Sequence, residues 1–315
     1  MSNLPPVAAP PTTAHVAYDY ALTDVFAERP LEGNQLAIFT DARGLTDTEM
    51  QSLARETNLS ETTFILPRDP EAEHHHGVRV RIFTTAEELP FAGHPTLGTA
   101  SWLYWHHPWL RAAEEIVLDL NVGPIPVRFT PSKPGEQGVF ATMRQNDPIF
   151  GEIQDHATVA KVLQISVDDL DPALPIQTVS TGNPFCIVPL KSLAASAQLR
   201  VPQTQQVSEY LRHNKAKFFY FLTRAESGSG ADWHARMQFY NGEDPATGSA
   251  AGPSIAWLVK HGVVESERRI VIEQGVEMLR PSRLYVSAAR VGDKVTNVFV
   301  GGRTIPVAMG RFFLP

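Results

Sequence analysis

The sequence predicts an α+β protein built from two similar halves, and three observations lead to this fold class. Residues 90–94 (PFAGH) and 245–249 (PATGS) share Pro and Gly at one spacing, 155 positions apart; the same offset relates a preceding Glu and a following Trp-Leu pair. Residues 33–38 (GNQLAI) resemble residues 182–187 (GNPFCI) at an offset of 149. Both halves also alternate between helical periodicity and strand-like alternation. Two matches in the same order indicate a duplication, with chance similarity among common turn residues as the alternative.

The composition is that of a globular protein with a substantial core. The chain has 315 residues, 43% of them hydrophobic and 19% charged, which is enough for two domains. Its formal net charge is −7 and it has no stripe of Lys and Arg, so we expect neither nucleic acid nor an anionic membrane surface as a partner. No apolar run reaches the ~18 residues of a membrane span. The single cysteine, Cys186, rules out an internal disulfide and a CxxC zinc site, and fits a reducing cytoplasm.

The two halves are expected to follow a short leader. Residues 1–14 are rich in Pro and Ala and carry no basic side chain, which predicts a mobile leader rather than a signal peptide. The first half is expected to cover residues 15–128, with the final strand at 305–315 as a candidate addition. The second half is expected to cover residues 129–304.

In the first half, the helix signals are the clearest. Thr46 and Glu49 form a capping-box pattern that begins a helix, which ends near Asn58. A second helix is expected at 96–105. Between residues 15 and 145, strands are expected at 15–26, 36–39, 78–83, 116–130 and 139–145, and residues 59–66 are expected to pass from a turn into a strand.

The second half repeats this plan. The segment at 242–249 begins a helix that runs to about His261, and shorter helical stretches lie near Leu193 and Val207. Strands are expected at 185–189, 218–223, 234–240 and over most of the remainder to Phe313.

The two repeated segments each place a glycine at the start of a helix. A helix start has unpaired N–H groups and a partial positive charge, and Gly93 and Gly248 would let an anion approach these amides closely. If the two starts face each other across a cleft between the halves, they form a cradle for a carboxylate. Asn34, Gly182 and Asn183, from the two Gly-Asn loops, would add donors at its rim. The alternative is that these glycines belong to ordinary helix caps.

Four side chains beside these elements are candidates for proton transfer. His94 and Ser249 occupy equivalent positions in the two repeats. Asp244 precedes the second helix, and Glu61 lies where a loop becomes a strand. A carboxylate and an imidazole in one closed cleft form an acid/base pair whose pKa values respond to desolvation and to each other. The alternatives are a surface carboxylate for Glu61, a packing role for His94 and a helix cap for the other two.

The motifs around these residues are similar to those of a known family. Residues 58–64 (NLSETTF), 89–98 (LPFAGHPTLG) and 243–253 (EDPATGSAAGP) together resemble the PhzF phenazine-biosynthesis family. Shorter matches lie at 33–34, 182–184, 274–277 and 280–282. The resemblance runs from about Tyr18 to Arg311, and the ordered set is far more specific than any single motif.

The resemblance implies a diaminopimelate-epimerase-like fold, with two barrel-like halves that each wrap a central helix and a site in the cleft between them. It also implies a homodimer. Isomerases of this family move a proton within a dihydro-hydroxyanthranilate substrate without a metal or an organic cofactor. The resemblance assigns the base to Glu61 and supporting roles to His94, Asp244 and Ser249. We therefore expect a cofactor-free cytoplasmic isomerase that acts on a small cyclic or aromatic-like carboxylate.

The residue types present in the chain distinguish this function from its alternatives. Related amino-acid epimerases use two cysteines, and this chain has only Cys186, so a two-thiol mechanism is excluded. A single carboxylate suits removal and return of a proton on one face of a substrate. A binding or regulatory protein without turnover, and an epimerase or lyase that uses the same base, are the alternatives. The histidines at 74–76 are expected in a solvated loop rather than a metal site, because consecutive side chains point in different directions.

Overall fold

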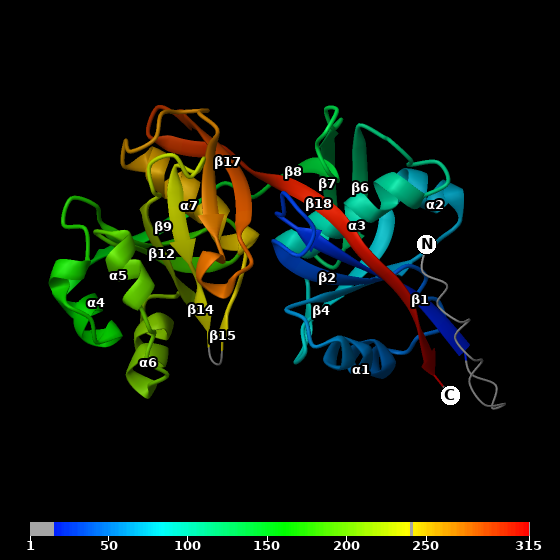
Figure 1. The fold of residues 1–315 in the computed structure, drawn as a ribbon, viewed down its shortest axis with the longest axis horizontal. Helices are drawn as coiled ribbons and strands as arrows, with labels where there is room; N and C mark the ends of the chain where they lie inside the picture. Colours follow the sequence, from blue (N-terminus) through cyan, green and yellow to red (C-terminus); the bar gives the residue numbers. More distant parts are fainter. Residues whose placement is uncertain (1–15, 240–241, 315) are drawn as a thin grey trace.

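The computed structural model describes residues 16–239 and 242–314, and it has two lobes side by side, each with strands around a central helix (Figure 1). The α+β fold class predicted from the sequence is confirmed. The leader predicted at 1–14 lies outside the described residues.

The described part of the first lobe forms a closed barrel of eight strands. β18 (Lys294–Leu314) closes it, because its middle pairs with β8 (Val139–Arg144) and its last part pairs with β1 (Val16–Val25). Between β1 and β8 the order is β2 (Asn34–Phe39), β3 (Thr62–Leu66), β4 (Val78–Phe83), β6 (Glu115–Leu120) and β7 (Gly123–Thr130). The short β5 (Glu88–Leu89) pairs with β4. The barrel therefore continues beyond residue 128 and includes the end of the described chain.

The second lobe wraps its strands around α7 (Gly248–Lys260). From β18 outward the order is β17 (Ser282–Val291), β16 (Ile270–Gln274), β13 (Trp233–Arg236), β12 (Phe218–Arg224), β11 (Pro184–Pro189), β10 (Ile176–Ser180) and β9 (Ile149–Gln154). β14 (Gln238–Phe239) and β15 (Gly242–Glu243) form a separate two-stranded sheet. β18 serves both lobes, and it crosses from one to the other as a long red ribbon in Figure 1.

The two central helices are buried because their residues are small or apolar on every face. In α3 (Gly93–His106), every residue from Gly93 to Leu103 is buried. In α7 the buried stretch reaches Val259, and Ser249 is half-buried. The helix predicted at 96–105 begins three residues earlier than expected, because Pro95 is accepted in the first helical turn.

Shorter helices cover the outsides of the lobes. They are α1 (Asp47–Thr57) and α2 (Pro70–His76) on the first lobe, and α4 (His156–Leu163), α5 (Leu193–Gln198) and α6 (Gln205–His213) on the second. The capping box predicted for α1 is present, because Thr46 accepts from the Glu49 amide while the Glu49 carboxylate accepts from the Thr46 amide. Two 3₁₀ turns, η1 (Val167–Asp169) and η2 (Val276–Met278), complete the elements.

The prediction of a loop at 74–76 is wrong, since these histidines form the last turn of α2. Asp69 caps this helix and Pro70 occupies its first turn, a strong start signal that the sequence prediction missed. Glu73 is buried beside His107, with 3.2 Å between its Oε2 and the imidazole Nε2. The three histidines are exposed, and the described residues contain no group of His, Cys, Asp and Glu able to hold a metal.

Two other predicted strands are interrupted. The run at 116–130 is a hairpin, because Gly123 has a positive φ of 110° and turns β6 into β7. The run at 234–240 leaves the main sheet after Arg236, where the Met237 carbonyl accepts instead from the Asp244 amide. This interruption brings the segment before α7 against β13.

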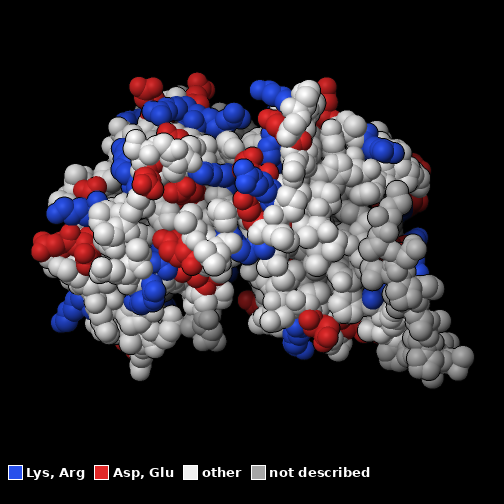
Figure 2. Space-filling model, in the orientation of Figure 1, with Lys and Arg blue, Asp and Glu red and all other residues white. Residues whose placement is uncertain are grey.

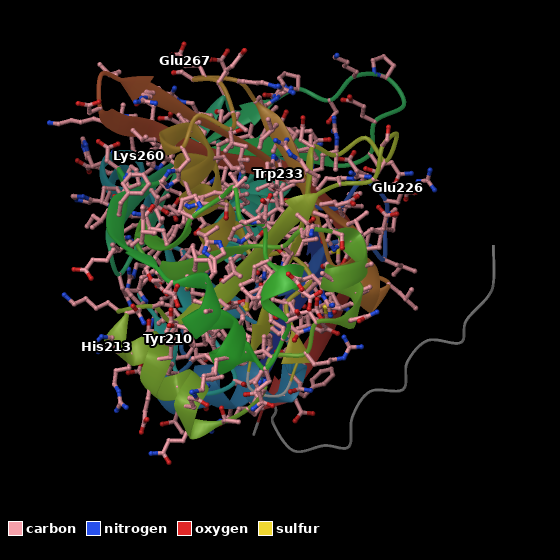
Figure 3. All side chains as sticks on the ribbon, turned by 90° about the vertical axis from the view of Figure 1, so that its left-hand side faces the viewer. Tyr210, His213, Glu226, Trp233, Lys260 and Glu267 are labelled. Atoms are coloured by element: carbon pink, nitrogen blue, oxygen red, sulfur yellow. The ribbon has the colours of Figure 1, made fainter. Side chains whose placement is uncertain are left out.

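One hydrophobic core connects the lobes, since Phe26, Leu97 of α3 and Trp257 of α7 belong to the same buried cluster. Viewed end-on, the second lobe has Trp233 in its interior and Glu226 and Glu267 at its margin (Figure 3). On the face shown in Figure 2, Lys and Arg lie among Asp and Glu. Within the described ranges, no helix has the length and hydropathy required to cross a bilayer.

Candidate functional site

The first turns of α3 and α7 abut each other where the two lobes meet. A Cβ atom added to Gly93 would lie 3.3 Å from the Ser249 amide nitrogen and 3.4 Å from the Gly248 carbonyl carbon. A Cβ atom added to Gly248 would lie 3.0 Å from the Phe26 ring and 3.9 Å from the Gly93 Cα. The two glycines permit this close approach, which brings two partially positive helix ends together.

These two helices differ from the others in how they begin. The N-cap residues of α1, α2, α4, α5 and α6 all accept a hydrogen bond from the helix backbone through a side-chain oxygen. Neither Ala92, the N-cap of α3, nor Thr247, the N-cap of α7, makes such a bond among the described residues. The alternative explanation of ordinary side-chain caps therefore does not apply at these two starts. Helix starts of this kind attract anions.

Glu61 and His94 lie together at this junction. Glu61 directly precedes β3, as predicted, and its Oε2 lies 3.5 Å from Nδ1 of His94, the second residue of α3. The His94 side chain is 5% exposed and the Glu61 side chain 17% exposed. The His94 Nε2 is buried without a hydrogen-bond partner among the described residues, which is unusual in a folded interior.

Burial moves the pKa values of this pair in opposite directions. Desolvation, helped by repulsion from Asp244, raises the pKa of Glu61 to about 8. Desolvation lowers the pKa of His94 to about 3. At neutral pH the imidazole is therefore neutral, and Glu61 is poised between its acid and base forms. Perturbed groups of this kind concentrate at functional sites.

Asp244 is held by a buried hydrogen-bond network between the lobes. Asn34 of the first lobe donates from Nδ2 to Asp244 Oδ1 at 2.7 Å and to the Ala246 carbonyl at 3.0 Å. The Thr247 hydroxyl donates to Asp244 Oδ2 at 2.6 Å. Burial raises the pKa of Asp244 to about 6, while the hydrogen bonds from Thr247 and Asn34 oppose that shift. Asp244 is not the N-cap of α7, and its carboxylate accepts from the side chains of Asn34 and Thr247.

Gln274 and Gln145 complete the network, and sequence reasoning did not assign them a role. Gln274 donates from Nε2 to the Asp244 carbonyl at 2.7 Å and accepts from the Thr247 amide at 3.1 Å. Gln145 donates to the Gly248 carbonyl at 2.9 Å and accepts from the Thr181 hydroxyl. Gln274 lies in a segment that contributed to the family resemblance, whereas only the three-dimensional pairing reveals Gln145.

The loop that carries Asn34 is fixed to the second lobe by Arg280. The Arg280 guanidinium donates to the Gly33 carbonyl at 2.8 Å and to Asp24 Oδ1 at 2.6 Å. Gly33 has a positive φ of 70°, and a Cβ atom there would lie 2.4 Å from the Val25 carbonyl oxygen. Only glycine fits, so the Gly-Asn sequence positions Asn34 toward Asp244.

The second Gly-Asn loop is connected to the start of α7 indirectly. Gly182 is exposed and Asn183 is half-buried. The loop connects to the start of α7 through the adjacent Thr181, by way of Gln145. Ser249 keeps its predicted position in the first turn of α7.

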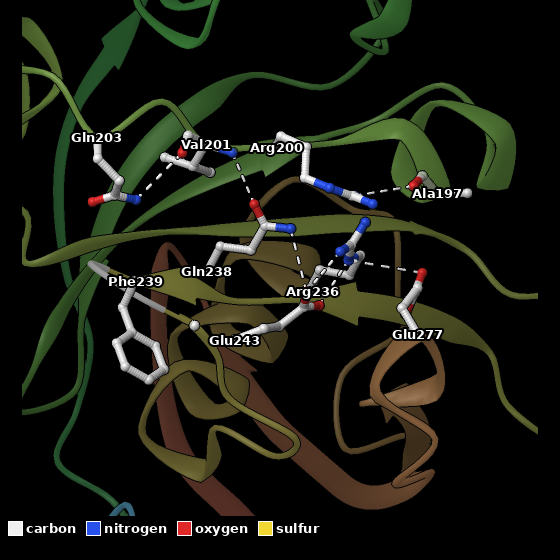
Figure 4. Close-up of a pocket in the computed structure, with 10 residues that line it drawn as sticks. Ala197, Arg200, Val201, Gln203, Arg236, Gln238, Phe239, Glu243 and Glu277 are labelled. Atoms are coloured by element: carbon white, nitrogen blue, oxygen red, sulfur yellow. Dashed lines mark hydrogen bonds and ion pairs between the residues drawn. The ribbon is translucent and has the colours of Figure 1, made fainter.

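A cavity of about 450 Å³ lies in the second lobe, beside the two-stranded sheet of β14 and β15 (Figure 4). Arg200, Arg236, Glu243 and Glu277 supply its charged walls, and Phe239 its aromatic one. Glu243 immediately precedes Asp244, so the cavity borders the segment that supports the site.

Comparison with known proteins assigns the family. The model of the phenazine biosynthesis-like protein family (PhzC-PhzF) matches residues 23–310. A trans-2,3-dihydro-3-hydroxyanthranilate isomerase from Pseudomonas chlororaphis is 37% identical over 94% of this chain and 100% of its own. The enzyme of that name from Pseudomonas aeruginosa is 34% identical over 94% of this chain and 99% of its own.

Solved structures agree with this assignment. A predicted epimerase from Pseudomonas aeruginosa is 36% identical, with a TM-score of 0.78 over 94% of this chain and 99% of that one. A PhzF-family protein from Bacillus anthracis is 25% identical, with a TM-score of 0.83 over 95% of this chain and 100% of that one. A probable proline racemase from Agrobacterium radiobacter, 12% identical with a TM-score of 0.63 over 95% of this chain and 93% of its own, shares the fold. The chain belongs to the phenazine biosynthesis-like family and is an isomerase of that family.

Proposed function

We propose that this isomerase moves a proton within a small cyclic carboxylate, and that Glu61 is the group that takes and returns the proton. The name of the Pseudomonas relatives gives the best first substrate, trans-2,3-dihydro-3-hydroxyanthranilate. The observation on which the proposal rests is the position of Glu61, whose side chain is largely shielded from solvent and lies 3.5 Å from His94 at the start of α3.

In this proposal the ionised Glu61 carboxylate removes a proton from a carbon next to a conjugated system. The electron pair shifts through that system, and the protonated Glu61 carboxyl then delivers the proton to another carbon on the same face. The reaction conserves all atoms and electrons and needs no oxidant or reductant. A pKa near 8 serves both steps, since a base and its conjugate acid are both accessible when the pKa lies near the working pH.

The neighbouring groups have distinct proposed tasks. The amides of Gly93, Gly248 and Ser249 hold the substrate carboxylate, because they lie at two helix starts without side-chain caps. Neutral His94 interacts with the substrate or with Glu61 through its imidazole nitrogens. Asp244 keeps negative charge near Glu61 and so raises its basicity. We place this activity in a cytoplasmic homodimer, with Gly182 and Asn183 at the rim.

Isomerisation in deuterium oxide tests the proposal. The purified protein is mixed with trans-2,3-dihydro-3-hydroxyanthranilate in D₂O, and ¹H NMR follows both the product and the hydrogen content of the ring carbons. We expect one isomer to form. If the proton on the Glu61 carboxyl exchanges with solvent before it is transferred, deuterium should appear at the carbon that receives it.

The other outcomes separate the alternatives. Binding without turnover or exchange, for this and related cyclic carboxylates, would overturn the proposal in favour of a binding protein. A product with inverted configuration at the original carbon would indicate an epimerase, and a product that has lost a leaving group would indicate a lyase.

A further inference from the structure

A buried network of charges lies behind the segment that holds Asp244. Arg236 is 2% exposed, and it donates from Nε and Nη2 to the two carboxylate oxygens of Glu243, at 2.7 and 2.6 Å. Its Nη1 donates to the Ser196 carbonyl. The Arg236 Nε also lies 3.8 Å from Glu277 Oε1. Figure 4 shows this fork over the Glu243 carboxylate at the wall of the cavity.

His234, on the same strand as Arg236, extends the network to Glu273 of β16. Its Nε2 lies 2.9 Å from Glu277 Oε1 and its Nδ1 lies 3.4 Å from Glu273 Oε1, while Arg283 lies 3.3 Å from the other oxygen of Glu273. Burial alone would lower the pKa of His234, but hydrogen bonds with Glu273 and Glu277 raise it to about 9. His234 is therefore a cation at neutral pH.

The groups that bond the Asp244 backbone are chain neighbours of members of this network. Asp244 follows Glu243, and its amide donates to the carbonyl of Met237, which follows Arg236. The Asp244 carbonyl accepts from Gln274, which follows Glu273. The bonds between charged side chains therefore hold the backbone at positions directly next to the groups that bond Asp244.

The structure assigns to Arg236 a positioning role: its two-pronged bond to Glu243 sets the place of the Asp244 carboxylate opposite Glu61. This inference rests on the proposed function, in which Asp244 keeps negative charge near Glu61. Within the described part of the chain, the titratable neighbours of Glu61 are His94 from α3, at 3.5 Å, and Asp244 from the segment before α7, whose charge raises the Glu61 pKa. A shift of Asp244 away from Glu61 would weaken their repulsion, make Glu61 a weaker base and lower its pKa.

Two variants test the role. Arg236→Lys keeps the charge but cannot form the two-pronged bond. The double variant Arg236→Met with Glu243→Leu replaces the pair by apolar groups, a change that buried ion pairs frequently tolerate. Arg268→Gln, which removes a solvent-exposed partner of Asp232 in the same lobe, is the matched control. Thermal melting confirms that each variant is folded.

We expect kcat to fall about tenfold or more in both variants while KM changes less than about threefold, because the defect lies in placement rather than in ligand binding. We also expect a lower Glu61 pKa in both, measured by ¹³C NMR of labelled glutamate, with the Glu61 signal identified by its absence in Glu61→Gln. The control should match the wild type in both measurements.

The role is wrong if either variant is folded and keeps wild-type kcat, or if kcat falls while the Glu61 pKa stays unchanged. Because the NMR titration does not require turnover, it separates this inference from the proposed function. A lowered Glu61 pKa in a protein that isomerises nothing would support the positioning role and reject the proposed function. If Glu61→Gln inactivates the enzyme but the two Arg236 variants keep wild-type kcat and an unchanged Glu61 pKa, the proposed function is supported and the positioning role is rejected.

Discussion

Glu61→Gln is expected to lower kcat by about 10³-fold or more, the scale typical of losing a general acid/base group. The glutamine has nearly the same shape, so packing against His94 should survive, but its amide cannot accept a proton from carbon. Binding of a non-reacting carboxylate such as anthranilate should stay within about threefold of wild type, because the helix-start amides are untouched. Steady-state kinetics and isothermal titration calorimetry measure the two effects.

Glu56→Gln, which changes an exposed carboxylate on α1, is the matched control and should retain full activity. If Glu61→Gln keeps more than about a tenth of wild-type kcat, Glu61 is not the base. If the variant loses binding and turnover together while remaining folded, Glu61 serves mainly to hold the ligand.

The pH dependence of activity is expected to be equally large. If the ionised form of Glu61 starts the reaction, kcat/KM should rise roughly tenfold per pH unit below its pKa and level off above about 8. The rise should be shallower around pH 6, because protonation of Asp244 there lowers the Glu61 pKa. At lower pH the rise should return to roughly tenfold per pH unit. His94 stays neutral over this range and adds no step. A profile that is flat between pH 5 and 9, or that levels off near pH 5, would contradict this assignment.

The raised pKa of Glu61 also makes the stability of the folded protein depend on pH. Between the ordinary glutamate value of 4.5 and about 8, the folded protein binds a proton at Glu61 that the unfolded chain does not. Stability therefore falls as pH rises through this window, and the contribution is lost above about 8. Glu61→Gln removes that loss and should be more stable than wild type at pH 9, by about 1–3 kcal/mol, with little difference at pH 4. Denaturant melts at the two pH values compare the pair.

Much of the fold could be predicted because its signals are local. The capping box at Thr46 and the repeated Pro and Gly at the start of each central helix indicate structure within a few residues of themselves. The loop expected at 74–76 shows the limit of this approach. The three histidines were considered only as possible metal ligands. Asp69 and Pro70, which precede them, are the residues that mark the start of α2.

The site was predicted less completely because hydrogen bonds between the lobes leave little trace in sequence. The family resemblance pointed to Glu61 and His94, and the structure brings them within 3.5 Å. The bond from Asn34 to Asp244 joins residues 210 positions apart, and Gln145 reaches Gly248 across 103 positions. Such pairs depend on how the two lobes meet, which no periodicity or spacing encodes.

A crystal structure with anthranilate bound tests most directly whether the junction of the two helix starts is the active site. We expect the ligand carboxylate to accept hydrogen bonds from the amides of Gly248 and Ser249, with a ring carbon facing the Glu61 carboxyl. A ligand bound only in the cavity beside Arg200 and Phe239, or anywhere remote from Glu61, would contradict the proposed proton transfer.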